Sequence, residues 1–290
     1  MHDNVGPAEK GLTPVVSPAS SLGYPAGMLE TPPQDTVERW LWDYIATTDL
    51  GHKLQPPPVP ARWEAYPPVR RVERPGRPVQ LRAARKARKF PGPGALRHVL
   101  GRARIVHTFV HHELQAAELM AWAILAFPET PATFRRGLLA ICREEMRHMQ
   151  LYADYLRTCD VVYGDFSVRD WFWDRVPAAT TAAHFVAVMG VGFEGGNLDH
   201  SARFARLFRD VGDEAGAAIV ETVGAEEIRH VRFAAHWFRR FTGDLDFDAW
   251  RAHLPPPLSP IVMRGDEMNQ IDRVRAGLGE EFLARLAASS

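Results

Sequence analysis

From about residue 94 onward, apolar residues recur every three to four positions, which is typical of helices that bury one face. Short turns and one long connection separate these stretches. Short, long and short connections are the wiring of a ferritin-like four-helix bundle with one crossover. The aromatic segment "DWFWDRV" in the crossover is expected to cap one end of the bundle. The pattern predicts four long helices, at residues 94–127, 132–159, 178–210 and 213–241.

Prolines interrupt the pattern on both sides of this region. They leave room for one short helix near residues 36–48, because proline removes an amide donor and clashes with the preceding turn. A proline-broken loop also precedes a further helix near residues 265–287. We therefore expect an all-α protein in four parts. These are a proline-rich N-terminal arm with one short helix (1–69), a basic connector (70–93), the bundle with a dinuclear metal site (94–243), and a C-terminal loop and helix packed on the bundle (244–290).

One acidic turn occurs twice, as "EEMRH" at residues 144–148 and "EEIRH" at residues 226–230. Each turn holds a Glu and a His three residues apart, so both side chains project from one side of a helix. Glu145 and Glu227 have apolar residues four positions before and after them, and an unpaired charge on such a stripe is costly. Carboxylate and imidazole together suit iron, manganese or zinc. The repeat therefore predicts a shared buried metal site.

Spacing selects the carboxylates on the other two helices. Glu113 precedes Glu145 by 32 residues, and Glu194 precedes Glu227 by 33. The chain thus looks like a duplicated helix pair that donates Glu, Glu and His from each half, as bundle sites for two metals require. The predicted ligands of two metal ions are Glu113, Glu145, His148, Glu194, Glu227 and His230.

Neighbouring acids leave alternatives open. Glu144 and Glu226 compete as ligands, since each lies four residues before a histidine, but the apolar stripe favours the residue after each. Arg147 and Arg229 are expected to point outward or to pair with acids.

Three more residues have two interpretations each. Glu118 and Asp199, each five residues after a ligand Glu, either accept hydrogen bonds from metal-bound imidazoles or form outer ion pairs. Tyr152 either relays an electron or proton or simply packs in the core. His107, His111 and His112 are expected to be packing or surface groups.

The segment "GVGFEGG" at residues 190–196 places four glycines around Glu194. Each costs a helix about 1 kcal/mol relative to alanine. One explanation is that the glycines leave space for substrate or dioxygen, or form a local bulge, beside the metal ligand. The other is that they allow close contact between helices.

Composition excludes several classes of protein. The chain has 290 residues and a formal net charge of zero, which argues against a general nucleic-acid or membrane-surface binder. Its two cysteines form no CxxC pair, so no disulfide scaffold or thiolate zinc site is indicated. With neither a secretory signal nor a membrane span visible, we expect a cytoplasmic protein.

One local basic stretch, residues 70–104, holds twelve cations and one acid. It is either a solvated connector or a lip that attracts an anionic substrate or RNA. Base stacking has little support there, because only Phe90 is aromatic.

The motifs "HTFVHHELQAAEL", "EEMRH", "GFEGGNLD" and "AEEIRHVRFAAHWF", in this order and spacing, resemble the bacterial ferritin-like family catalogued as domain of unknown function four-five-five. That family is distantly similar to tRNA-modifying diiron hydroxylases. The likeness covers about residues 70–285, and the arm before residue 70 looks like an addition. The resemblance implies metals at the six positions above and does not indicate a substrate.

These features favour a diiron or iron–manganese oxidoreductase, a monooxygenase that activates dioxygen to oxidise a small organic substrate with electrons from an external donor. The alternatives are ferritin-like metal handling or peroxide detoxification, a helical interaction protein that keeps metals for stability, and an RNA-modifying hydroxylase. RNA is a possible but not favoured partner. No membrane partner is expected, and the sequence is compatible with an oligomer.

Overall fold

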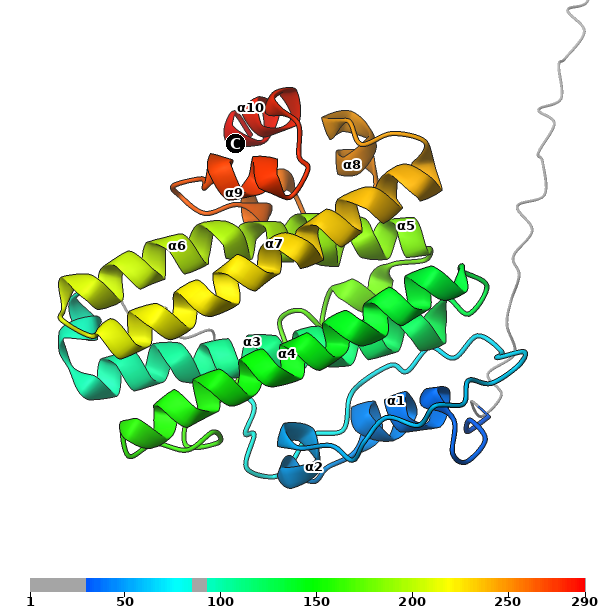
Figure 1. The fold of residues 1–290 in the computed structure, drawn as a ribbon, viewed down its shortest axis with the longest axis horizontal. Coiled ribbons are helices and arrows are strands. Elements are labelled where there is room, and N and C mark those ends of the chain that lie inside the picture. Colours follow the sequence, from blue (N-terminus) through cyan, green and yellow to red (C-terminus); the bar gives the residue numbers. More distant parts are fainter. Residues whose placement is uncertain (1–29, 85–92, 290) are drawn as a thin grey trace, which may run out of the picture. The chain divides into compact units, whose positions relative to one another are not determined.

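The computed structural model describes residues 30–84 and 93–289 (Figure 1). The helices belong to one compact unit that begins at Thr31. Among the described residues no strand forms, and the expected all-α fold is confirmed. No helix in this part of the chain is long and apolar enough to cross a bilayer.

Four helical rods form the bundle. The first two are α3 (Val99–Ala126) and α4 (Ala132–Thr158). The third is continuous but composite, and the fourth is α7 (Glu214–Thr242). The third rod consists of α5 (Ala182–Phe185), a π-helix (Val186–Glu194) and α6 (Gly195–Asp210).

The rods pack as two antiparallel pairs, α3 with α4 and α6 with α7, and α4 also contacts α7 (Figure 1). Short turns join the members of each pair, and the crossover at residues 159–181 joins the pairs. The third rod begins later than expected, at Ala182, because Thr181 caps it: the Thr181 side chain accepts a hydrogen bond from the His184 amide.

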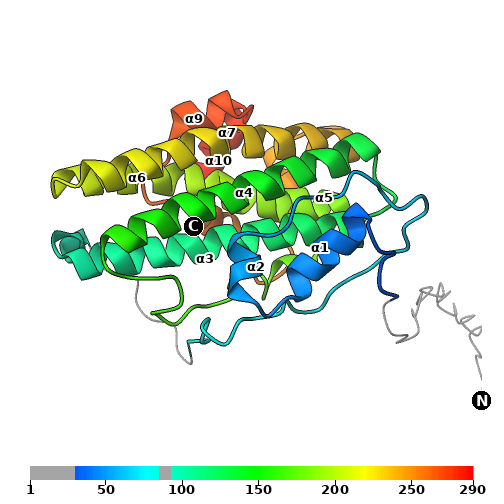
Figure 2. The same cartoon turned by 60° about the horizontal axis from the view of Figure 1, so that its bottom comes forward.

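The described part of the N-terminal arm, residues 30–69, covers the α3/α4 side of the bundle (Figure 2). It contains α1 (Val37–Ala46), which contacts α3, and the unexpected short helix α2 (Leu50–Leu54), which contacts α4. Leu41 and Tyr44 of α1 are fully buried, so the described part of the arm belongs to the core.

The C-terminal segment covers the α6/α7 side (Figure 1). It contains α8 (Phe247–Ala252), α9 (Gln270–Arg275) and α10 (Glu280–Ala287). The single helix expected at 265–287 is wrong, because Gly277 takes a positive φ of 91° between α9 and α10. That backbone conformation ends a helix and favours glycine.

The aromatic crossover segment lies along the middle of α3 and does not cap an end of the bundle. The Gln115 side-chain oxygen accepts a hydrogen bond from the Phe172 amide at 3.0 Å. Phe172 also stacks on Phe193 of the third rod, with ring centroids 5.0 Å apart. The crossover is thus fixed against the part of the bundle that holds the candidate site.

Candidate metal centre

Four of the six predicted ligands meet in the middle of the bundle. Each offers one ligand atom, and these atoms all lie within 4.8 Å of one another. All four side chains are buried. They come from three rods: Glu113 on α3, Glu145 and His148 on α4, and Glu227 on α7.

His230 of α7 adjoins this group. Its Nδ1 lies 2.8 Å from Glu227 Oε2 and 2.9 Å from Glu145 Oε1. His148 Nδ1 lies 3.1 Å from Glu145 Oε2 and 3.4 Å from Glu227 Oε1. Glu145 and Glu227 therefore lie between the two imidazoles, whose ring centroids are 5.8 Å apart.

Glu194 lies beside the group but outside the tight set of four. It is 5% exposed, and its Oε1 has no hydrogen-bond partner among the described residues. It lines a cavity together with Glu113. The six-ligand assignment thus stays a prediction, with four members in one tight cluster, His230 in contact with it and Glu194 at its edge.

The glycine-rich segment forms the π-helix that ends at Glu194. The Gly195 amide bonds to the Gly190 carbonyl, five residues back, and this is the local bulge that the glycines suggested. Close contact between helices is also present: a Cβ on Gly190 would lie 2.2 Å from the Ala234 Cβ of α7. The glycines thus serve both the bulge and the close contact.

Each imidazole is held from behind by an acid on the opposite helix. His148 Nε2 lies 2.8 Å from Glu226 of α7, and His230 Nε2 lies 2.9 Å from Glu144 of α4. A carboxylate only accepts hydrogen bonds, so each Nε2 carries the proton and donates it. This leaves both Nδ1 atoms facing Glu145 and Glu227.

The two arginines of the repeat complete this arrangement. Arg147 pairs with Glu226, and Arg229 pairs with Glu144, so the expected pairing of both arginines with acids is confirmed. The hydrogen bond from His230 is the main cause that lowers the pKa of Glu144 to about 2. Glu144 therefore stays ionised and keeps its role as an acceptor.

The first acid of each turn is thus a partner of the imidazole, whereas the sequence presented it as a rival ligand. The signal was present as the doubled "EE" of both motifs. Only the packing of α4 against α7 shows that each acid serves the histidine of the other helix.

The buried carboxylates of the centre need positive charge to balance them. Burial lowers the pKa of His148, but the close carboxylates of Glu113, Glu145 and Glu227 outweigh it and raise the pKa to about 12. Burial raises the pKa of Glu194 well above its usual range, and the charges of Glu227 and Glu145 add to this. Several carboxylates in one dry place repel each other unless cations lie between them.

The donors present fit metal ions. A neutral imidazole that donates from Nε2 turns its Nδ1 lone pair toward carboxylate oxygens, which are also acceptors. Such facing acceptors need a cation between them, either a proton or a metal ion. Glu145 Oε1 lies 2.9 Å from His230 Nδ1 yet makes no hydrogen bond, and the buried Oε1 atoms of Glu194 and Glu227 also lack one among the described residues. This cluster can hold a metal.

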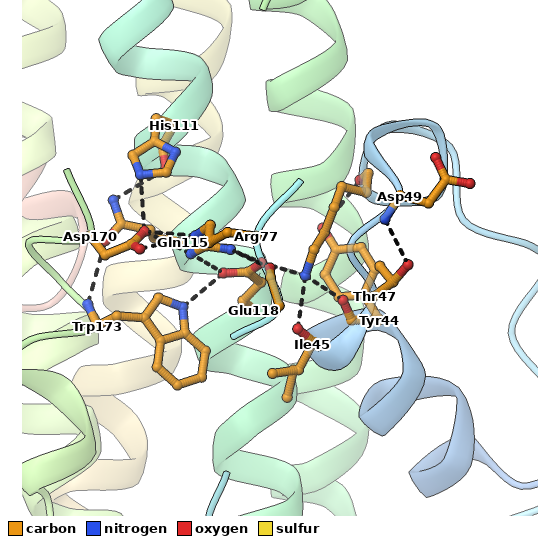
Figure 3. A network of polar contacts seen from close by, with 12 residues as sticks. Tyr44, Ile45, Thr47, Asp49, Arg77, His111, Gln115, Glu118, Asp170 and Trp173 are labelled. Carbon is orange, nitrogen blue, oxygen red and sulfur yellow. Dashed lines mark hydrogen bonds and ion pairs between the residues drawn. The ribbon is translucent and has the colours of Figure 1, made fainter. Parts of the chain in front are cut away.

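Glu118 does not hold an imidazole. Its carboxylate accepts hydrogen bonds from Lys53 at 2.7 Å, from Arg77 at 2.6 and 2.8 Å, and from the Trp173 indole at 2.8 Å. Figure 3 shows Glu118 between Arg77 and Trp173, in a network that continues to Asp170 and His111. The outer ion-pair interpretation is therefore correct, although the pair is buried.

Asp199 plays the equivalent part in the second half. It is fully buried with Arg273 of α9, whose guanidinium donates to both carboxylate oxygens at 2.9 and 2.8 Å. The Gly265 and Asn269 amides also donate to it. Glu118 thus fastens the N-terminal arm, and Asp199 fastens the C-terminal segment.

Most described cations of the basic stretch bind within the protein. Arg77 pairs with Glu118 and Asp170, and Arg102 pairs with Asp213 at 2.7 Å. Arg71 donates to two carbonyls of the crossover and lies over Trp122 and Phe127. These residues are not a solvated connector, and an RNA-binding role for the stretch stays a prediction. Residues 85–92 lie outside the described part of the chain.

The histidines of α3 are packing groups, as expected. His107 is buried and accepts a hydrogen bond from the Gly164 amide at 2.9 Å. His111 is buried between the Tyr163 hydroxyl and Asp170. His112 is partly buried and lines the cavity beside Glu113.

Two adjoining cavities, here called lobes, share Glu113 among their lining residues. One lobe, of about 250 Å³, is lined by Trp171, Phe172 and Phe193 together with Glu194. The other, of about 320 Å³, is lined by Phe109, Tyr152 and Phe204. Tyr152 is packed against Phe109 with ring centroids 5.5 Å apart, and burial raises its pKa well above the usual value. Packing accounts for Tyr152, and a relay stays a prediction.

The family described as "Protein of unknown function (DUF455)" matches residues 36–284. The chain belongs to this family. A relative from Haemophilus influenzae, described as an uncharacterized protein, is 24% identical over 196 residues, which is 63% of this chain and 67% of that protein. None of the solved structures matches the chain.

The resemblance to this family is confirmed, but the family match covers more of the chain than the expected residues 70–285. The match begins at residue 36 and thus includes residues 36–69 of the arm that looked like an addition. Lys53 explains why the arm belongs to the DUF455 fold: it is fully buried, and its ammonium reaches Glu118 in the middle of α3. The six predicted ligands also lie within the matched residues.

Proposed function

We propose that this protein is a dinuclear iron or iron–manganese oxidoreductase that uses dioxygen to hydroxylate a small organic substrate. One observation carries the proposal: Glu113 of the buried Glu and His cluster, with Glu194 beside it, lines a cavity whose other walls include the rings of Trp171, Phe172 and Phe193. A cavity that reaches a redox metal site would give an organic molecule access to it.

The donor set supports two ions. Glu113, Glu145, His148, Glu194, Glu227 and His230 would hold them. Glu145 and Glu227 each lie near both imidazoles, so they are placed to be shared between two ions. Four carboxylates balance the charge of two divalent cations, and oxygen and imidazole donors without thiolate suit iron and manganese.

The surrounding side chains define what the protein itself contributes. Glu226 and Glu144 keep both imidazoles in the tautomer that presents Nδ1 to the metal. The aromatic walls exclude water from the reacting end of the cavity. Bound iron or manganese would supply the electron transfers that side chains cannot perform.

In the overall reaction, one atom of dioxygen enters a C–H bond of the substrate to give an alcohol. The other atom is reduced to water by two electrons and two protons from an external donor. The closed network around Arg77 gives the RNA alternative no support, since its cations are already paired.

Two measurements on the purified protein test this function. Metal analysis is expected to give two iron or manganese ions per chain, and the reduced protein is expected to consume dioxygen in a fixed ratio to its metal. Glu227→Ala should lose the metal, whereas Glu221→Ala, on the same helix but paired with Arg209 at the surface, should keep it. Accumulation of many irons per chain would indicate metal storage, and inertness to dioxygen would exclude the oxidase reaction.

A further inference from the structure

The cavity beside the metal centre has an unequal distribution of charge. Its two lobes meet at His112, Glu113, Asn197 and His200, which line both. The lobe beside Glu194 is walled by three aromatic rings, of which Phe172 and Phe193 stack at an interplanar angle of 16°. Glu113 and Glu194 therefore face an aromatic compartment.

The lobe farther from Glu194 is lined by a cationic side chain. Among the described residues that line either lobe, Arg203 of α6 is the only lysine or arginine. Its guanidinium lies over the Phe204 ring, 5.7 Å from the centroid. The nearby acid Glu267 is bound by Arg206 at 2.7 Å, and Arg203 makes no ion pair with another described residue. A guanidinium at the edge of an apolar cavity attracts a carboxylate, because two parallel hydrogen bonds can form.

The other polar walls do not compete for an anion. Burial lowers the pKa of His200, so its imidazole is neutral near pH 7 and can donate or accept a hydrogen bond. Ser201 and Asn197 are also neutral. Glu113 also lines this lobe, and the proposed metal ions would neutralise its charge, which leaves Arg203 to set the charge preference.

We propose that the cavity binds an arylalkyl carboxylate. Its acid group pairs with Arg203. Its ring passes between the lining residues that the two lobes share and lies in the aromatic lobe beside Glu113 and Glu194. Oxidation of the bound acid rests on the proposed function. In that reaction a C–H bond of the ring end would lie beside the metal centre. The lobe volumes of about 250 and 320 Å³ are those of a small-molecule site.

A matched pair of ligands tests the charge preference. The metal-loaded protein is titrated calorimetrically with 3-phenylpropanoate and with 3-phenylpropanamide, which has nearly the same shape but no charge. The acid is expected to bind about tenfold more tightly than the amide, as one charge-assisted pair provides. Equal affinities for the two ligands would overturn the proposal.

Two variants on the same helix test the residue. Arg203→Gln should weaken binding of the acid about tenfold and leave the amide within about twofold. Arg206→Gln removes the same charge, but from an exposed pair with Glu267 outside the cavity, and should change neither affinity. Equal losses in both variants would mean that the acid senses only the general charge of α6.

A third variant tests the location. Val220 is buried and lines the lobe of Arg203, so Val220→Phe should fill that space and weaken both ligands. If the acid still binds normally, it lies outside the cavity. The titrations read binding, not turnover, so they separate the two proposals. Arg203-dependent binding without reaction with dioxygen rejects only the proposed function, and reaction with dioxygen without Arg203-dependent binding rejects only this inference.

Discussion

The carboxylate of Glu144 on α4 accepts a hydrogen bond from His230 Nε2 on α7, across a distance of 2.9 Å. Glu226 and His148 make the reciprocal bond from α7 to α4 at 2.8 Å. Each half of the repeat thus supplies a metal-ligand candidate and the group that orients the ligand of the other half. Loss of either acid should disturb a histidine on the opposite helix.

We expect the double variant Glu144→Gln, Glu226→Gln to bind metal about 10–100-fold more weakly, because an amide neither fixes the tautomer nor supports the charge of the imidazole. Competition with a chelator measures the affinity. Glu221→Gln is the control, since Glu221 lies on α7 but pairs with Arg209 at the surface. Unchanged metal affinity in the double variant would show that the hydrogen bonds do not position the ligands.

Glu194 should affect stability with opposite signs in the two metal states. Burial and the charges of Glu227 and Glu145 disfavour an ionised Glu194 in the metal-free protein, and glutamine carries no charge to bury. Glu194→Gln should therefore raise the Tm of the metal-free protein and lower the Tm of the metal-loaded one. Thermal unfolding with and without chelator checks this.

The control for Glu194 is Glu129→Gln, which alters an exposed acid and should leave both transitions in place. A decrease of Tm in both metal states for Glu194→Gln would mean that this residue is structural. An unchanged Tm in the loaded state would remove it from the ligand set.

The helices and the cluster could be predicted because both leave a local trace in the sequence. A buried helical face repeats every three to four residues, and a charge on that face needs a partner, so Glu145 and Glu227 were recognisable. The duplication then identified Glu113 and Glu194 by spacing alone. None of this required knowledge of how the rods are rotated.

Other features depend on contacts between distant segments. An arginine that pairs inside the protein looks the same in the sequence as a solvated one, and Arg77 finds its partners 41 and 93 residues away. The roles of Glu144 and Glu226 depend on the rotation of α4 against α7. The break at Gly277 follows from its positive φ, which a glycine allows but does not require.

Glu118 should be important for stability and unimportant for metal binding. Glu118→Gln would leave Lys53 and Arg77 with uncompensated positive charge, which we expect to lower the free energy of unfolding by about 3–5 kcal/mol. Chemical denaturation measures this loss, and metal content per folded chain should stay unchanged. Glu267→Gln is the control, because its exposed pair with Arg206 is screened by water and should contribute little to stability. Metal loss in a folded Glu118→Gln protein would show that Glu118 takes part in metal binding.

His107 should make the fold sensitive to acid. Burial, with a smaller contribution from His111, lowers its pKa to about 4 from the usual 6.5. Between these values the unfolded chain takes up a proton that the folded protein excludes, so the free energy of unfolding falls as the pH is lowered through this window. The loss reaches about 3 kcal/mol near pH 4, at about 1.4 kcal/mol per pH unit.

Replacing His107 with Gln isolates this effect, because the Gln side-chain oxygen can still accept the hydrogen bond from the Gly164 amide but does not titrate. Urea denaturation of metal-free protein between pH 4.5 and 7.5 should show a flatter dependence for His107→Gln than for the natural chain. His236→Gln alters an exposed histidine and should follow the natural chain. If His107→Gln and the natural chain lose stability in parallel, His107 is protonated as easily in the folded protein as in the unfolded chain, and its hydrogen bond to Gly164 does not hold the ring neutral.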